Sequence, residues 1–481
     1  MSNLAKESAM NRINALLDEN SFVEIGGLVT ARSTDFNMQD KVAASDGVIT
    51  GYGVIDNSLV YVYSQDASIL GGTVGEMHAK KISRLYDMAV KMGAPVVALV
   101  DCAGLRLEEA ADALNAFGEV YAKQAAASGV VPQVTAVFGT CGGGMGVMAS
   151  LSDFTFMAED GKLFVNAPNT LDGNRAEKCD TASAAYQAEV SGMADYTGTE
   201  EEVLAGIRQL VSVLPMNNDD FAEEQCADDL NRVCENLADC VGDTEIALEN
   251  LADAGTFFEI KKAYAKNMVT GFMKLNGITV GAVANRAVVY DEEGKTEELG
   301  TALTAEGCEK AADFVNFCDA FNIPVLTLTN ASGFAATVDN EKRIAKAAAK
   351  LTYAYAEATV PKVNVVVGQA MGNAYNVMNS KACNADIVYA WPDAKIGTMD
   401  SDAAVRIIYA EEIKKAEDSV AFINEKKAEY ETLQVSAASA AKRGYVDSII
   451  APEDTRKYVI GAFEMLYTKK EERPAKKHGT V

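Results

Sequence analysis

The chain has 481 residues, of which 49% are hydrophobic and 23% charged, a composition typical of a globular protein with two or three domains. Its formal net charge of −26 argues against nucleic-acid binding and against an anionic membrane surface, since both require a basic face. Two histidines and nine cysteines without a CxxC pair offer no histidine-rich, zinc or iron–sulfur site, so we expect no metal and a reducing, cytoplasmic compartment.

The N-terminal half predicts alternating strands and helices. Residues 46–66 have the alternation of a β-hairpin, residues 76–93 have a helical period, and residues 94–101 are an apolar strand. A second helix over residues 113–129 leads to a strand over residues 130–139. That strand runs into the segment GTCGGGMGVM, residues 139–148, which has five glycines in its first eight positions.

The C-terminal half repeats this order. It predicts a hairpin, a helix, a strand, a helix and a strand over residues 267–287, 304–322, 323–330, 342–358 and 359–368. Asp101 and Asn330 correspond, as do Gly139 and Gly368, and each pair is separated by 229 positions. We infer an α/β fold of two similar domains, 1–240 and 241–481, whose boundary lies in an acidic segment. A long helical tail over about residues 404–441 is expected to follow the repeated elements of the second domain.

The glycine-rich segment has three interpretations. A dinucleotide-binding loop is disfavoured, because the next strand follows too soon for the usual helix and acidic residue. The glycines could instead only allow close packing of a helix on a strand. The third interpretation is an oxyanion hole, in which backbone N–H groups at a helix start stabilise a developing negative charge.

Motifs along nearly the whole chain resemble the carboxyltransferase subunits of biotin-dependent acyl-CoA carboxylases and decarboxylases. They include RINALLDENSFVEIG, DGVITGYGVI, YSQDASILGGTVGEMHAKKI, FFEIKKAYAKNMVTGFMKLNG and the tail RPAKKHGTV. This family includes propionyl-CoA carboxylase β subunits and the α subunits of methylmalonyl-CoA and glutaconyl-CoA decarboxylases. The resemblance implies two tandem crotonase-like domains with a β-β-α spiral, the N-terminal one for acyl-CoA and the C-terminal one for biotin.

The resemblance also implies roles for individual residues. The N–H groups of Gly143 and Gly144 would hold the thioester enolate oxygen, and those of Asn373 and Ala374 the ureido oxygen of biotin. Other expected contacts are, for biotin, Gly372, Phe334 and Tyr375; for the CoA phosphates, Lys80, Lys81, Arg84 and Arg106; and, for the choice of acyl group, Asn376.

Three turns depart from the family pattern. The family's DSGGAR is DCAGLR at residues 101–106, its DxPGF is NASGF at 330–334, and its GGAYD is GNAYN at 372–376. These changes leave the acyl group that is used, and the direction of the reaction, open.

The resemblance implies partners as well. The chain has no MKM biotin-attachment sequence, so biotin would reside on a separate carrier protein. The other components would be a biotin carboxylase, or the membrane subunits of a decarboxylase, to which this chain would be peripheral. The chain itself would form a homodimer or a hexamer built as a trimer of dimers.

Two rival functions remain at this point. A biotin-independent hydratase or isomerase of the crotonase type could use Glu108 and Glu109, which follow the DCAGLRL segment. A non-catalytic scaffold for a biotin carrier is motivated by the altered NASGF and GNAYN turns.

Overall fold

The computed structural model describes residues 2–32, 36, 38–41, 43–220, 226, 228–290 and 295–474. The chain divides into two compact units, unit 1 (Met1–Ala222) and unit 2 (Glu223–Val481). The division falls within the acidic segment 217–243 that the sequence suggests as the boundary.

Unit 1 is built on an eight-stranded sheet with the order β1-β2-β3-β4-β5-β6-β8, and β7 pairs with the end of β5. Strands β1 to β3 are antiparallel, and the pairs from β3 to β8 are parallel. The strands are β1 (Val23–Glu24), β2 (Val48–Ile55), β3 (Ser58–Gln65), β4 (Val96–Cys102), β5 (Gln133–Gly142), β6 (Phe154–Ala158), β7 (Lys162–Phe164) and β8 (Tyr196–Gly198).

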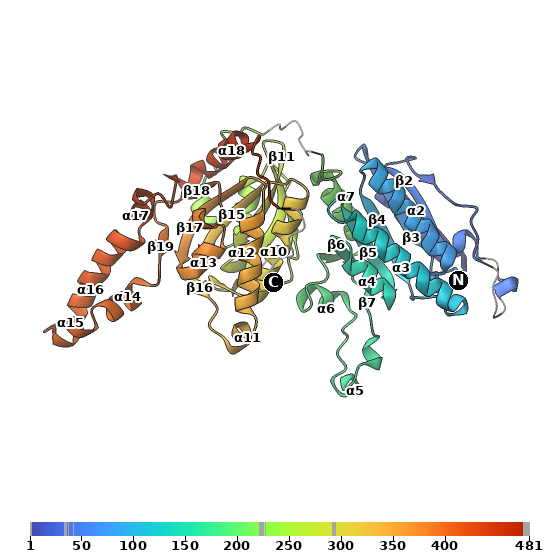
Figure 1. The fold of residues 1–481 in the computed structure, drawn as a ribbon, viewed down its shortest axis with the longest axis horizontal. Helices are drawn as coiled ribbons and strands as arrows, with labels where there is room; N and C mark the ends of the chain where they lie inside the picture. The colour runs from blue at the N-terminus through green and yellow to red at the C-terminus, as the bar shows by residue number, and fades with distance from the viewer. Residues whose placement is uncertain are drawn as a thin grey trace. The chain divides into compact units, whose positions relative to one another are not determined.

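Helices cover this sheet (Figure 1). α2 and α3 pack against each other, while α1 contacts β3 and α7 contacts β6. An apolar stripe at helical spacing, which includes Ile82, Leu85 and Ala89, buries one face of α2. The main helices are α1 (Ser2–Leu16), α2 (Glu76–Met92), α3 (Ala110–Ala127), α4 (Gly144–Ser150), α5 (Asn174–Glu177), α6 (Ala184–Glu189) and α7 (Glu200–Val213).

Unit 2 has the same sheet, with the order β9-β10-β11-β15-β17-β18-β20 and with β19 paired to the end of β17. Its strands are β9 (Phe258–Ile260), β10 (Met268–Leu275), β11 (Ile278–Asn285), β15 (Val325–Ala331), β17 (Lys362–Met371), β18 (Ile387–Ala390), β19 (Lys395–Gly397) and β20 (Ser448–Ile449). Two small ladders pair β12 (Val288–Tyr290) with β13 (Thr296–Glu298), and β14 (Ala302–Leu303) with β16 (Gly333–Phe334).

Helices of unit 2 occupy the equivalent places. α10 and α12 pack together as α2 and α3 do, and one large core cluster joins α9 and α18 to the sheet through Leu248, Val459 and Phe463. The helices are α8 (Leu237–Cys240), α9 (Thr244–Leu251), α10 (Ala305–Ala320), α11 (Val338–Glu341), α12 (Ile344–Glu357), α13 (Gly372–Val377) and α18 (Thr455–Leu466).

The repeat extends to single hydrogen bonds. Asp101 Oδ1 accepts the N–H of Thr140 at 3.1 Å, and Asn330 Oδ1 accepts the N–H of Gln369 at 2.9 Å. Both bonds bridge the same point of the sheet, where the parallel register shifts at the end of β4 or β15. The predicted duplication of one α/β domain is therefore confirmed.

The expected helical tail is not one helix and does not follow the sheet. It is an arm inserted between β19 and β20, and Figure 1 shows α14, α15 and α16 projecting away from the sheet of unit 2. The arm consists of α14 (Ser401–Ile408), α15 (Ala410–Lys415), α16 (Ser419–Tyr430), a π-helical turn (Glu431–Val435) and α17 (Ala437–Lys442).

Candidate functional site

In each unit a short helix begins directly at the end of a long central strand. α4 follows β5 in unit 1, and α13 follows β17 in unit 2. The first N–H groups of a helix have no partner within the helix, and the helix dipole makes this end electropositive. Both helix starts can therefore stabilise an oxyanion.

The free amides of unit 1 are shifted by one residue from the expected pair. The N–H of Gly143 donates to the carbonyl O of Phe164 at 2.9 Å, so this amide is already used by the fold. In the described part of the chain, no acceptor bonds the N–H groups of Gly144 and Met145. The N–H groups of Gly144 and Met145, rather than those of Gly143 and Gly144, are therefore the pair left without a partner at this helix start.

This shift makes the two units consistent with each other. The equivalent positions in unit 2, 229 residues later, are Asn373 and Ala374. Their N–H groups lie in the first turn of α13 and likewise have no acceptor among the described residues.

Most of the glycines in the segment 139–148 serve internal packing. A Cβ on Gly139 would overlap with the carboxylate of Asp101. A Cβ on Gly144 would lie 2.8 Å from the hydroxyl of Tyr121, and one on Gly146 would lie 3.1 Å from the carbonyl O of Phe164. Gly143 alone faces open space, with a φ of +60° that disfavours other residues.

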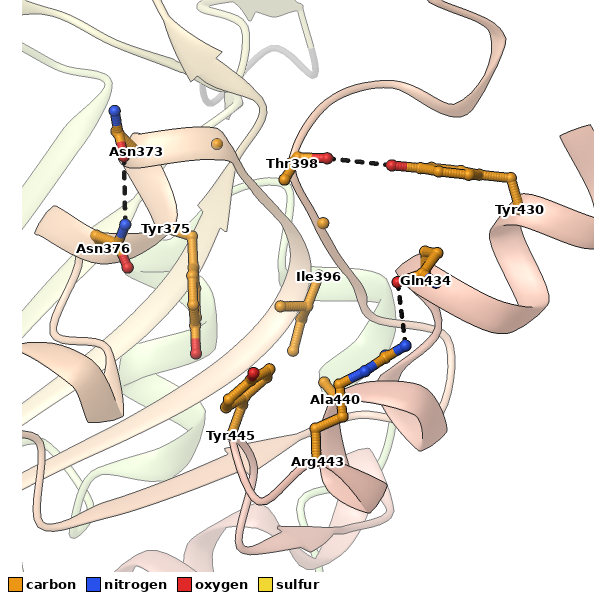
Figure 2. A pocket seen from close by; sticks show the side chains of 12 residues that line it. Asn373, Tyr375, Asn376, Ile396, Thr398, Tyr430, Gln434, Ala440, Arg443 and Tyr445 are labelled. Carbon is orange, nitrogen blue, oxygen red and sulfur yellow. Dashed lines mark hydrogen bonds between the residues drawn. The ribbon is translucent and has the colours of Figure 1, made fainter. Parts of the chain in front are cut away.

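The start of α13 opens into a pocket of about 540 Å³ (Figure 2). Four predicted residues line it, namely Gly372, Asn373, Tyr375 and Asn376. Phe334 and Ala374 are not among the lining residues; Phe334 lies in β16, which packs against α13, and Ala374 is buried.

The inner wall of the pocket is polar but uncharged. The side-chain amide of Asn376 donates to Oδ1 of Asn373 at 3.3 Å, and this contact leaves the backbone N–H of Asn373 free. Figure 2 shows the ring of Tyr375 and the side chain of Ile396 among those that line the cavity. Burial raises the pKa of the Tyr375 phenol, so it remains a neutral hydroxyl.

The outer wall of the pocket was not predicted from the sequence. It contains Thr398, Tyr430, Gln434, Ala440, Arg443 and Tyr445, which come from the end of β19, from the arm and from the residues that directly follow α17. A π-helical turn holds Gln434, and such turns are common at functional sites. Sequence periodicity reveals no π-helical turn, so the arm was expected to be plain helix.

Two of the four cations expected to bind CoA phosphates are internal. Arg106 is 1% exposed, and its guanidinium pairs with Asp46 and with Glu109, the latter at 2.7 Å. The ammonium of Lys81 donates to the carbonyl oxygens of Ser45, at 3.1 Å, and Val48. Arg106 and Lys81 therefore stabilise unit 1, and this structure gives no support to the expected contact of either side chain with phosphate.

Burial also changes how easily Lys81 is charged, because desolvation lowers its pKa to about 8. The other two expected cations, Lys80 and Arg84, are exposed on the opposite face of α2. Lys80 pairs with Glu76 at 2.5 Å, one turn away. These two remain candidates for an anionic ligand.

The glutamates that a crotonase-type hydratase would need are not free. Glu109 is 4% exposed, binds Arg106 and accepts the N–H of Glu76 at 2.7 Å. Glu108 pairs with Lys41 at 3.5 Å. Both carboxylates are paired with cations, which argues against the hydratase.

His78 is fully buried beside Asp46, the carboxylate that pairs with Arg106. Its Nδ1 lies 2.9 Å from the carbonyl O of Asp46, and its Nε2 lies 3.1 Å from Nε2 of Gln65. Burial lowers its pKa to about 3, so the ring is neutral at physiological pH. Gln65 in turn contacts the sulfur of Met145 at 3.8 Å, which connects the buried network to the first turn of α4.

The described residues include neither a long apolar helix nor a cluster of metal-binding side chains. None of their helices has the length and apolar character that a bilayer crossing requires. No group of three or more of their His, Cys, Asp and Glu side chains could hold a metal ion.

Comparisons with known proteins match this chain to one family over nearly its whole length. The carboxyl transferase domain model matches residues 3–481. The propionyl-CoA carboxylase beta chain of Roseobacter denitrificans is 40% identical over 490 residues, covering 99% of this chain and 94% of that protein. The methylmalonyl-CoA decarboxylase subunit alpha of Propionigenium modestum is 39% identical over 490 residues, covering 99% and 93%.

A solved structure is also similar to this chain over nearly its whole length. Transcarboxylase 12S, described as a hexamer with methylmalonyl-coenzyme A and methylmalonic acid bound, has a TM-score of 0.91 and 36% identity over 98% of this chain and 91% of that one. This likeness and the repeated sheets confirm two tandem crotonase-like domains. The chain therefore belongs to the carboxyl transferase domain family.

Proposed function

We propose that this chain is the carboxyltransferase component of a biotin-dependent enzyme. It moves a carboxyl group between biotin on a separate carrier protein and the α-carbon of a short acyl-CoA. The observation that carries the proposal is the pair of equivalent helix starts. Each has two free amides, and one of them opens into a pocket of about 540 Å³.

Unit 2 is the proposed biotin side. Biotin supplies a ureido nitrogen that can carry the carboxyl group between two active sites. The residues of the pocket suit its bicyclic ring, because Ile396 and Ala440 offer apolar contact, and the N–H groups of Asn373 and Ala374 can donate to the ureido oxygen. The volume lies within the usual range for small-molecule sites, about 300–1,000 Å³.

Unit 1 is the proposed acyl-CoA side. The N–H groups of Gly144 and Met145 would donate to the thioester oxygen and stabilise the enolate that forms when the α-carbon loses its proton or its carboxyl group. Gly143 suits this role indirectly, since it presents no side chain to the open space at the helix start. Few ionisable groups are needed, which fits a site without a free histidine.

The altered GNAYN turn is compatible with this function. Asn373 replaces a family glycine, but its side chain is exposed and bonded to Asn376, so its backbone N–H stays available. We assign Asn376, which lines the pocket, to the choice of acyl group. Lys80 and Arg84 are the proposed contacts of the CoA phosphates.

The proposed assembly follows from the relatives. A separate biotin carrier is required, with either a biotin carboxylase or membrane decarboxylase subunits as the further partner. The hexamer described for transcarboxylase 12S favours a homodimer-based assembly, in which unit 1 of one copy could face unit 2 of another.

Two substitutions at a single position, Asn373, test the proposal. Asn373→Pro removes the backbone N–H at a first-turn position where proline fits the helix, whereas Asn373→Ala removes only the side chain. We expect Asn373→Pro to reduce carboxyl transfer from methylmalonyl-CoA to biotin methyl ester by about 10²–10³ in kcat. Asn373→Ala should retain most of it.

The readout is carboxyl transfer measured with radiolabelled substrate, on variants whose oligomeric state matches the wild type. Equal activity of the proline and alanine variants would contradict the role of this amide. Absence of transfer in the wild type with every short carboxyacyl-CoA would contradict the function itself.

A further inference from the structure

Arg443 is the only charged residue among the twelve that line the pocket of unit 2, and none of the twelve is acidic. The lining of the pocket thus has one net positive charge, whereas the whole chain has a net charge of −26. Figure 2 shows the Arg443 side chain lying along the wall next to Gln434. Arg443 is exposed, so its attraction for an anionic ligand acts through solvent at the mouth of the cavity and is reduced by salt.

The guanidinium group is held only by uncharged acceptors. Its Nη2 donates to the carbonyl O of Leu433 and to Oε1 of Gln434, both at 3.0 Å. Its Nη1 donates to Ser439, through the carbonyl O at 3.4 Å and through the hydroxyl. Among the described residues, no carboxylate forms an ion pair with Arg443, and Asp447, four positions later in the chain, pairs with Lys381.

The wall that carries this charge is fixed. The hydroxyls of Tyr430 and Thr398 are 3.1 Å apart, which ties α16 to the end of β19. The hydroxyl of Ser401 donates to Glu431 at 2.7 Å, and Val435 is buried against Gly397. The charge is therefore held in place beside the pocket before any ligand arrives, so binding need not order the side chain.

The two forms of biotin differ in charge. Biotin linked to its carrier by an amide is uncharged, and N-carboxylated biotin has one negative charge. We propose that Arg443 is a specificity-determining residue that makes the pocket prefer carboxylated biotin over uncharged biotin. This inference rests on the proposed function, which assigns biotin to this pocket.

Equilibrium binding to the full-length protein tests the inference without an activity measurement. The probes are two stable biotin methyl esters. One has a carboxymethyl group on the ureido nitrogen and is an anion, and the other has the uncharged methyl ester of that group. For the wild type we expect a Kd roughly tenfold lower for the anion, a preference that salt reduces.

Three variants separate charge from geometry. Arg443→Gln should abolish the preference, and Arg443→Lys, which keeps the charge but not the forked hydrogen bonds, should keep most of it. Lys442→Gln is the matched control, because it removes an exposed charge one residue away that does not line the pocket. Its preference should equal that of the wild type.

The inference is overturned if Arg443→Gln keeps the preference. It is also overturned if Arg443→Lys loses it as Arg443→Gln does, since Arg443 would then only brace the wall. If the wild type binds neither ester, the inference and the assignment of biotin to this pocket fail together. An Arg443-dependent preference in a protein that transfers no carboxyl group would support the inference and contradict the proposed function.

Discussion

Gly139 and Gly368 occupy equivalent positions, and each makes room for the side chain that bridges the neighbouring strand. A Cβ on Gly368 would lie 2.5 Å from Oδ1 of Asn330, as one on Gly139 would overlap with Asp101. These two glycines therefore serve the sheet rather than the substrate. The bridging side chain in turn bonds the residue after each glycine and so fixes the end of the strand that precedes the helix start.

The first residue-scale prediction compares two glycines of unit 1. Gly139→Ala should lower the free energy of unfolding by about 2 kcal/mol, because Asp101 must leave the N–H of Thr140. Gly118→Ala should raise it by about 0.5–1 kcal/mol, since this position lies inside α3 with nothing within 4 Å of the added Cβ. Denaturant unfolding measures both; equal effects would contradict the packing argument.

The charged residues of α2 explain one failure of the sequence analysis. Lys81 lies between His78 and Ile82 on the buried face of the helix, and Lys80 and Arg84 lie on the exposed face. Helical spacing could have separated Lys81 from Lys80 and Arg84. The burial of Arg106 could not be predicted in this way, because its partner Asp46 is 60 positions away.

At the scale of elements, the strand β9 contains a buried carboxylate. Glu259 is 8% exposed, and its nearest cation in an ion pair is Arg286, at 3.7 Å. Burial raises its pKa from 4.5 to about 7, against the attraction of Lys310 and Arg286. The charged form is thus disfavoured in the folded protein.

This shift predicts a pH dependence of stability. Between pH 4.5 and 7 the folded protein binds more protons at Glu259 than the unfolded chain, so this contribution is full below 4.5 and is lost as the pH rises through 7. The loss is about 3 kcal/mol. Glu259→Gln should flatten the decline of the thermal midpoint between pH 5 and 8; an unchanged slope would contradict the assignment.

The elements that the sequence predicted best are those of the repeat. Both hairpins, both central strands and the helices α2, α3, α10 and α12 occur where the periodicity indicated, because each has an apolar face of regular spacing. The arm was predicted poorly. Its breaks and its π-helical turn depend on contacts such as Tyr430 with Thr398, which join residues far apart in sequence.

At the scale of the whole molecule, the duplication provides two equivalent helix starts, which are the proposed oxyanion sites, from one folding pattern. β5 and β17 have the same length and are separated by 229 positions, and so are the amide pairs that follow them. A reaction with two oxygen-bearing partners, a thioester and a urea, can use one site for each. The units differ at one equivalent place: unit 1 has the short helices α5 and α6 between β7 and β8, whereas unit 2 has the arm between β19 and β20 that contributes to the pocket.

Mixing two inactive variants tests whether the two sites that cooperate belong to different copies. Met145→Pro removes an amide of unit 1, and Asn373→Pro removes one of unit 2. If unit 1 of one copy works with unit 2 of another, subunit exchange should restore roughly a quarter of the wild-type transfer, because random pairing leaves one intact site in half of the dimers. No recovery after verified exchange would mean that both sites act within one chain.

The most direct measurement is a structure of the assembled protein with a short acyl-CoA and a biotin ester bound. The account predicts the thioester oxygen about 3 Å from the nitrogens of Gly144 and Met145, and the ureido oxygen equally close to those of Asn373 and Ala374. A thioester or urea bound elsewhere, with these four amides facing only solvent, would contradict it.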